Sequence, residues 1–273
     1  MRYGYCVNMI AEDPYGVGYA WIPFLQKWGF DYVDLPMAQI MGMDDASFEN
    51  LVLSPLRETG FPCVCVNNLF PASIRLTGPN AMTDAAISYA RRAFSRAAQM
   101  GASRAVFGSS GARNVPFGWP RAEAERQLAE LLRRLAPVAA AYGITLVIEP
   151  LNRGESNILT SIADSMCLYQ EVNSPQVQML VDFYHMSLSG EGNVEASVTG
   201  SALRHVHIAR PLGRGLPMPG DGEDYTGFFQ MLHSIGYYGD VSIEAYIPAS
   251  IEASAKEALT YLKSCEHVLE GLS

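Results

Sequence analysis

Four polar residues in the second half of the chain have the types and spacing to bind one metal ion. Each comes late in a short apolar run: Glu149 after Leu-Val-Ile, Asp182 after Met-Leu-Val, His207 after His-Val, and Glu244 after Val-Ser-Ile. Three carboxylates cannot all stay ionised in one dry pocket unless a cation balances them. A ligand set of oxygens with one imidazole suits Mn²⁺, Mg²⁺ or Co²⁺ better than Zn²⁺, which it still admits. We expect one divalent ion, with Mn²⁺ as the first candidate.

The first of these residues makes the need for a partner clear. Glu149 stands at the tip of an apolar run, where an unpaired buried charge would be strongly unfavourable. Pro150 follows it, which keeps Glu149 out of the helical region and ends an interior strand ladder. For any single residue of the four, an ion pair with an arginine is an equally good explanation. Their recurrence on four successive strands favours a shared ion.

Two glutamates beside a metal ion can also serve as the base and the acid of a proton transfer, because one carboxylate can take a proton while the other returns one. We therefore expect Glu149 and Glu244 to be the catalytic pair.

Short strand-like runs alternate with helical patterns along the whole chain. The expected strands are 2–9, 31–37, 62–68, 104–109, 145–151, 178–184, 204–209 and 240–246. The clearest helical patterns are 83–100, 121–142 and 251–269. Eight such units of about 34 residues each predict one (β/α)8 TIM barrel as a single domain over 1–273. A doubly wound open sheet is the alternative, but no GxGxxG motif follows the first run.

The composition limits the possible partners. The net charge is −9 and the chain has 19 lysines and arginines, so no basic face for nucleic acid is expected. No apolar run approaches the ~18 residues of a membrane span, and no signal-peptide pattern is visible. Five cysteines form an odd set without a CxxC pair, which is typical of a reducing compartment. We therefore expect a cytoplasmic protein with no nucleic-acid or membrane partner.

The segments VIEPLNRGESN, VDFYHM, HVHIA and SIEAY, within 145–246, resemble the xylose isomerase-like TIM barrels. This is the sugar phosphate isomerase/epimerase superfamily, and the pattern is most similar to ketose 3-epimerases of the D-tagatose 3-epimerase type. The resemblance implies an isomerase or epimerase acting on a ketose or related small sugar, in which a metal chelated by the carbonyl and a neighbouring hydroxyl would stabilise the enediolate that forms when the proton leaves. Glu149 and Glu244 would then act on opposite faces of the carbon and exchange roles with the direction of reaction. Epimerisation and 1,2-aldose–ketose isomerisation both fit this pattern, and the sequence does not separate them.

The resemblance also implies that the four residues above bind one divalent metal ion. Relatives often pair, so a homo-oligomer is a candidate assembly that the sequence itself does not decide.

The resemblance further implies contacts with the sugar. His185, three residues after Asp182, would hydrogen-bond sugar oxygens, and Glu155 would reach a hydroxyl. The family has an arginine six residues past the metal-binding histidine, where this chain has Gly213. Arg210 or Arg214 would take its place.

Other interpretations remain open at this level. An inosose-type dehydratase would use the same metal site, and a nuclease similar to the apurinic-site endonucleases would need more metal ligands and a basic groove. Asp34, at the end of the second strand, could face the substrate or form a salt bridge at the rim. His205 could be an extra ligand or an interior histidine below the metal. Asn67 could offer its amide to sugar hydroxyls or cap its loop.

Overall fold

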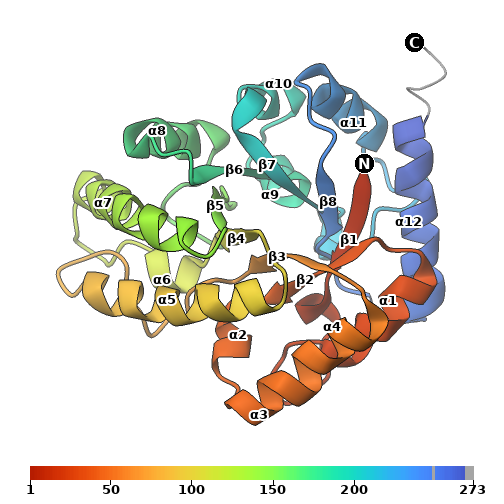
Figure 1. The fold of residues 1–273 in the computed structure, drawn as a ribbon. Helices are drawn as coiled ribbons and strands as arrows, with labels where there is room; N and C mark the ends of the chain where they lie inside the picture. Colours follow the sequence, from red (N-terminus) through yellow and green to blue (C-terminus); the bar gives the residue numbers. More distant parts are fainter. Residues whose placement is uncertain (248–249, 268–273) are drawn as a thin grey trace.

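The computed structural model describes residues 1–247 and 250–267, and these residues form a closed parallel barrel. The strands follow one another around the barrel in chain order, from β1 to β8, and β8 pairs with β1. Figure 1 shows the strands at the centre and the helices around them. The strands are β1 (Arg2–Cys6), β2 (Tyr32–Pro36), β3 (Cys63–Asn67), β4 (Arg104–Phe107), β5 (Thr145–Ile148), β6 (Val177–Asp182), β7 (Leu203–Ile208) and β8 (Asp240–Ile243). The TIM-barrel prediction is confirmed.

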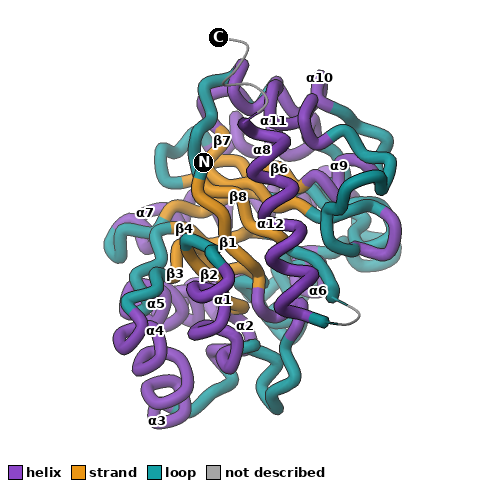
Figure 2. The backbone as a smooth tube through the Cα atoms, turned by 90° about the vertical axis from the view of Figure 1, so that its right-hand side faces the viewer, coloured by secondary structure: helices purple, strands orange, loops and turns teal. Residues whose placement is uncertain are grey.

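The outer layer consists of amphipathic helices that turn their apolar faces toward the strands. In α7 (Arg121–Ala140), Leu128, Leu131 and Leu135 are buried at helical spacing. Figure 2 shows α12 (Ile251–His267) crossing in front of β1 and β8. The other helices are α1 (Ile22–Trp28), α2 (Met37–Met41), α3 (Asp45–Phe48), α4 (Ser54–Thr59), α5 (Thr83–Gln99), α6 (Ser110–Arg113), α8 (Ile162–Val172), α9 (Phe183–Leu188), α10 (Asn193–Ser197) and α11 (Tyr225–Ser234). The expected helices 83–100, 121–142 and 251–269 correspond to α5, α7 and α12, although residues 268 and 269 lie outside the described part.

The interior of the barrel is apolar on one side and polar on the other. A separate buried cluster comes from neighbouring strands β3 to β6: Cys65, Val106, Val147 and Leu180. Successive side chains of a strand point to opposite faces, and the residues beside these four belong to the outer core, so the cluster faces inward. The facing strands β2, β7 and β8 instead bury Asp34, His205 and Ser242. A polar interior of this kind must satisfy its own hydrogen bonds.

A close approach in the barrel interior explains one glycine. A Cβ atom at Gly4 would lie 2.1 Å from Cε2 of Tyr32, so the tyrosine ring fills the space that a side chain in β1 would need. The Tyr32 hydroxyl lies 2.9 Å from the Ser242 Oγ atom on the far side of β1. Glycine at this position therefore leaves room for the polar contact between Tyr32 of β2 and Ser242 of β8 inside the barrel.

The parallel strands bring their carboxyl ends to one rim. In β6 and β7, Asp182 pairs with His207, and His207 pairs with Ser242 of β8. Glu244 lies two residues beyond Ser242, and Glu149 comes directly after β5. The register therefore places these side chains at one level, where active sites of such barrels lie. Among the described residues, the structure contains no helix with the length and hydropathy needed to cross a bilayer.

Candidate active site

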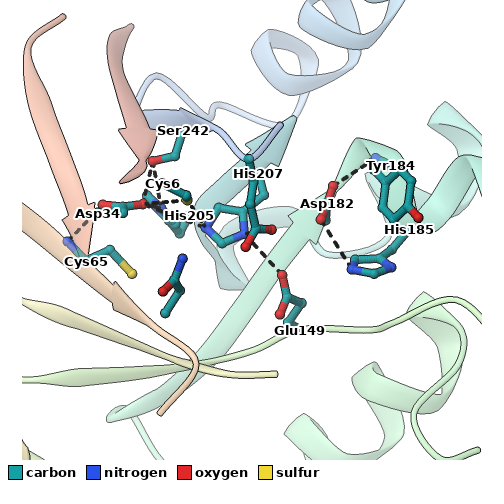
Figure 3. A network of polar contacts seen from close by, with 12 residues as sticks. Cys6, Asp34, Cys65, Glu149, Asp182, Tyr184, His185, His205, His207 and Ser242 are labelled. Atoms are coloured by element: carbon teal, nitrogen blue, oxygen red, sulfur yellow. Dashed lines mark hydrogen bonds and ion pairs between the residues drawn. The ribbon is translucent and has the colours of Figure 1, made fainter. Parts of the chain in front are cut away.

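The carboxyl ends of β5 to β8 bring together the four residues expected to bind a metal ion. This carboxylate–histidine cluster consists of Glu149, Asp182, His207 and Glu244, all at most 8% exposed. One potential ligand atom from each residue lies within 4.8 Å of the corresponding atoms of the others. The Nδ1 atom of His207 is 3.1 Å from Glu149 Oε1 and 3.1 Å from Glu244 Oε2. Figure 3 shows His207 linked to Glu149, with Asp182 beside them.

Asp182 has a carboxylate oxygen without a hydrogen-bond partner. Its Oδ1 atom accepts a hydrogen bond from the backbone N–H of Tyr184 at 2.8 Å, but Oδ2 has no such donor among the described residues. Burial, opposed by Arg214 and reinforced by the Glu244 and Glu149 carboxylates, raises the pKa of Asp182 to about 7. A buried carboxylate in these surroundings is stabilised by an added cation.

Arg214 is the cationic side chain nearest to Glu244. Its Nη2 atom lies 2.6 Å from Glu244 Oε2 and 3.7 Å from Asp182 Oδ2, and the guanidinium covers the Tyr184 ring at 4.6 Å. Burial alone would raise the pKa of Glu244, but the charges of Arg214 and His207 hold it well below its usual range. Glu244 is therefore ionised and oriented by a charge-assisted hydrogen bond.

The loop after β7 bends back and places Arg214 beside Glu244. Gly213 and Arg214 have φ values of 70° and 47°, a left-handed conformation that non-glycine residues adopt at some energetic expense. The Arg214 carbonyl accepts a hydrogen bond from Tyr246 N–H at 2.9 Å, which ties the bend to the chain after β8. Arg210 is left outside the cleft, where its Nε donates to the Leu212 carbonyl at 3.1 Å. Of the two candidate arginines, the structure brings only Arg214 to the cluster.

Arg113, which was not expected from the sequence, supports the backbone of Glu149. Its guanidinium is buried and donates to the carbonyl oxygens of Phe107 at 2.6 Å and of Glu149 at 2.8 Å. It therefore ties the end of β4 to the end of β5. Burial, opposed by the charge of Glu149, lowers the pKa of Arg113 to about 10, so the side chain remains a cation at neutral pH. An arginine in a βα loop has no spacing signal by which sequence could have found it.

His185, in α9, presents a neutral imidazole to the cleft. Its Nδ1 atom accepts a hydrogen bond from the Asn152 backbone N–H at 3.1 Å, so the ring proton is on Nε2. Nε2 lies 3.6 Å from Asp182 Oδ2. Burial, together with the charge of Arg214, lowers the pKa of His185 to about 3. The Asn152 side chain also donates to Glu155 Oε1 at 3.0 Å, so one amide positions both residues expected to contact substrate.

Asp34 and His205 do not lie at the rim. Both are fully buried inside the barrel, and His205 Nε2 is 2.8 Å from Asp34 Oδ2. The substrate contact that the sequence suggested for Asp34 is wrong because the side chain is fully buried, and the suggested salt bridge forms with His205 inside the barrel instead of at the rim. His205 is an interior histidine held by this aspartate.

The cluster opens into a cleft of about 250 Å³. The acidic side of the cleft carries Glu149, Glu155 and Glu244, with His185 and Arg214. Most of the remaining lining is uncharged and comes from the segments after β1, β3 and β4: Asn8, Met9, Asn67, Asn68, Gly108, Ser109 and Ser110. Asn67 donates from Nδ2 to Asn8 Oδ1 at 2.9 Å, whereas its own buried Oδ1 has no hydrogen-bond partner among the described residues. Such a cleft offers hydrogen bonds to a small polar molecule.

The cluster fits a single divalent cation. Three carboxylates and one imidazole supply ligand atoms close together, and the free Oδ2 atom of Asp182 is a buried acceptor that a cation would satisfy. Oxygen-rich sites with one imidazole suit the harder divalent ions. The chemistry of the donor set therefore agrees with the expectation from the sequence.

Comparison with known proteins identifies the family. Residues 22–265 match the model of the family described as "Xylose isomerase-like TIM barrel", and the chain belongs to this family. It is 32% identical over 166 residues to the 3-dehydro-D-guloside 4-epimerase of Escherichia coli (strain K12), covering 59% of this chain and 62% of that protein. It is 28% identical over 243 residues to a ketose 3-epimerase of Arthrobacter globiformis, covering 86% of this chain and 79% of the other.

A solved structure shows the same fold. The D-psicose 3-epimerase of Clostridium cellulolyticum H10, crystallised with D-tagatose, superposes with a TM-score of 0.85 at 18% identity, over 97% of this chain and 99% of that one. At this identity the likeness concerns the fold alone. The similarity to the E. coli relative spans about three-fifths of its length.

Proposed function

We propose that this protein is a divalent-metal-dependent epimerase acting on a ketose or related small sugar. The observation that carries the proposal is the position of two glutamates, each 3.1 Å from the same His207 nitrogen, at the edge of an open polar cleft. Epimerisation needs an acid and a base on opposite faces of one carbon. The relatives that are epimerases of sugars support the assignment of the reaction class.

Each polar group of the cleft has a defined task in this reaction. Glu244, held ionised by Arg214, takes the proton from the carbon next to the ketone, and the electron pair stays on the sugar as an enediolate. Glu149, which enters this step protonated, then gives its proton to the opposite face of the same carbon and becomes the carboxylate, while Glu244 keeps the proton it took. The reverse reaction starts from these protonation states with the two roles exchanged. His185 donates its Nε2 proton in a hydrogen bond to a sugar oxygen. A bound divalent ion, with Mn²⁺ as our first candidate, would supply Lewis-acid stabilisation of the developing negative charge.

The uncharged lining of the cleft would bind the part of the sugar that does not react. The Asn67 Oδ1 atom has no partner among the described residues, so a sugar hydroxyl donating to it would satisfy a buried acceptor. Arg214, which also lines the cleft, is engaged by Glu244. This arrangement favours a neutral, hydroxylated substrate over a phosphorylated one.

Gly108 gives a test of the metal-binding part of the proposal. A Cβ atom at this position would lie 1.9 Å from Glu149 Oε2, so Gly108→Ala must displace the carboxylate from the cluster. We expect a folded variant that binds Mn²⁺ roughly 10–100-fold more weakly, measured by calorimetric titration. Gly192→Ala is the matched control, because its Cβ would meet only Glu195 Oε2 at 3.7 Å. Equal Mn²⁺ affinity in Gly108→Ala and the wild type would contradict the role of Glu149 as a ligand.

The reaction itself is tested with free ketoses in D₂O. The protein, loaded with Mn²⁺, is incubated with a panel of ketopentoses, ketohexoses and keto-glycosides, and the products are analysed by NMR and mass spectrometry. We expect deuterium at one carbon next to the ketone and a product inverted at that carbon, with both lost after chelation. Appearance of an aldose would identify a 1,2-isomerase instead, and loss of water would identify a dehydratase. Absence of exchange with every sugar would refute the proposal.

The compartment and the assembly belong to the same proposal. All five cysteines are free, and four of them are buried, which suits a reducing cytoplasm. We propose a homo-oligomer, and light scattering of the purified protein would measure its mass.

A further inference from the structure

Asp34 is a buried carboxylate directly below the carboxylate–histidine cluster. Its Oδ2 atom accepts hydrogen bonds from Ser242 Oγ at 2.5 Å and from His205 Nε2 at 2.8 Å, and its Oδ1 atom accepts from the Cys65 backbone N–H at 3.2 Å. Figure 3 shows these contacts converging on Asp34 from β3, β7 and β8. Within the described part of the chain, no lysine or arginine forms an ion pair with Asp34; its charged or chargeable partners are histidines.

The Asp34 carboxylate also lies on the Nε2 side of the His207 ring. Nε2 of His207 lies 3.7 Å from Asp34 Oδ2 and 3.8 Å from the Sγ atom of Cys6. The Sγ atom of Cys6 in turn lies 3.9 Å from Asp34 Oδ2. The thiol can therefore accept a hydrogen bond from His207 Nε2 and donate one to Asp34. The Asp34 carboxylate, the other neighbour of Nε2 in this direction, can only accept.

The Nδ1 side of the His207 ring faces the metal-binding cluster instead. Nδ1 points to Glu149 and Glu244 at 3.1 Å, which is the side where a metal ion would bind. A neutral imidazole has one ring proton, and it can bind a metal only through the nitrogen that lacks that proton. A proton on Nε2 meets Asp34 and Cys6, whereas a proton on Nδ1 would leave the Nε2 lone pair facing a carboxylate.

We propose that Asp34 is a positioning residue for the metal site. It keeps the ring proton of His207 on Nε2, and so leaves Nδ1 free to bind the ion. Ser242 and His205 hold the carboxylate in place for this purpose, and Tyr32 extends the hydrogen-bond chain through Ser242. Carboxylates behind metal-binding histidines orient the ring and increase its basicity. The inference rests on the metal-binding part of the proposed function and does not depend on which sugar is the substrate.

The first experiment measures Mn²⁺ affinity without any sugar, by calorimetry, in the Asp34→Asn variant. This substitution keeps the shape of the side chain but removes its charge. We expect a 10–100-fold rise in the Mn²⁺ dissociation constant, with a lower melting temperature of the metal-free protein, because the amide cannot accept all the hydrogen bonds that the Asp34 carboxylate accepts. Ser242→Ala, which keeps the carboxylate but removes one of its donors, should weaken binding by less than Asp34→Asn.

Asp31→Asn is the matched control, because Asp31 precedes the same strand and accepts a hydrogen bond from the Tyr3 backbone N–H at 2.7 Å, far from the cluster. Its Mn²⁺ affinity should equal that of the wild type. A lower melting temperature with unchanged Mn²⁺ affinity in Asp34→Asn would show a purely structural role and overturn the inference, while leaving the epimerase proposal intact. Failure of the wild type to bind Mn²⁺ would overturn both.

A second measurement uses the wild-type protein and therefore does not depend on the folding of a variant. Nitrogen-15 NMR of labelled histidines, with the diamagnetic ion Mg²⁺ or Zn²⁺ bound, reports the protonated nitrogen of each ring. We expect His207 to carry its proton on Nε2, and Asp34→Asn, where it folds, to shift that signal. A proton on Nδ1, or an ion bound through Nε2, would refute the inference.

Discussion

Glu149→Gln and Glu244→Gln are each expected to lower solvent deuterium incorporation into a ketose substrate by about 10²–10⁴-fold, the contribution usual for a general acid or base. Glutamine has nearly the shape of glutamate, but its amide cannot take a proton from carbon or return one. Both residues lie at the edge of the same cleft and are at most 8% exposed, so solvent would not readily replace them as base or acid. The measurement is proton–deuterium exchange followed by NMR at saturating Mn²⁺.

The control for this pair has to separate loss of proton transfer from loss of metal. The Mn²⁺ content of each variant is therefore measured in the same samples, and the exchange rate is compared at equal occupancy. Glu252→Gln, on the exposed surface of α12 where Glu252 pairs with Lys256, tests the substitution itself and should leave the rate unchanged. Wild-type exchange in either of the two cleft variants would refute the two-glutamate mechanism.

The sequence was sufficient to predict the four residues of the cluster because, in a parallel barrel, residues at the ends of successive strands lie at the same end of the barrel. Glu149, Asp182 and Glu244 stand at or just after the last residue of their strands. All strand ends of such a barrel meet at one rim, so a polar residue repeated at this stage of successive strands must converge there. The contacts of His207 with both glutamates are consistent with this reasoning.

Asp34 shows where the same reasoning fails. It also comes late in an apolar run, but β2 continues to Pro36, and the pairing of β2 with β3 has an irregularity between Val33 and Asp34. The carboxylate therefore lies inside the barrel instead of at its rim. A local shift in register cannot be read from the side-chain pattern alone, because inward-facing residues alternate with outward-facing ones in the same way at the rim and deeper inside the barrel. Arg113 and Asn152 were missed for a related reason, since each acts through a contact with a distant strand end or helix, Glu149 for Arg113 and His185 for Asn152, that no sequence spacing encodes.

The choice between Arg210 and Arg214 depended on loop geometry that no pattern encodes. Two consecutive residues with positive φ, Gly213 and Arg214, turn the chain so that the second arginine enters the cleft and the first lies against its own loop. Glycine permits this conformation freely, whereas arginine adopts it at some expense. A strained residue at a functional site is consistent with a role that the surrounding contacts enforce.

Arg214→Gln is expected to lower kcat/KM by roughly 100-fold or more, corresponding to about 3 kcal/mol for breaking a largely buried ion pair. The substitution removes the 2.6 Å contact with Glu244 and leaves that carboxylate beside Asp182 without its cation. Mn²⁺ affinity should be unchanged or higher, because a positive charge next to the cluster is lost. A simultaneous loss of Mn²⁺ binding would instead show that Arg214 only supports the metal site.

The neighbouring arginine provides the control for this prediction within one loop. Arg210→Gln changes the same side chain four residues earlier, but its guanidinium contacts the Leu212 carbonyl outside the cleft, so kcat/KM should stay near the wild-type value. Arg214→Lys keeps the charge but loses the planar fork that reaches Glu244 while covering the Tyr184 ring, and it should retain only part of the activity. Equal losses in the Arg210 and Arg214 variants would contradict the assignment, because only one of the two side chains can reach the carboxylate that moves the proton.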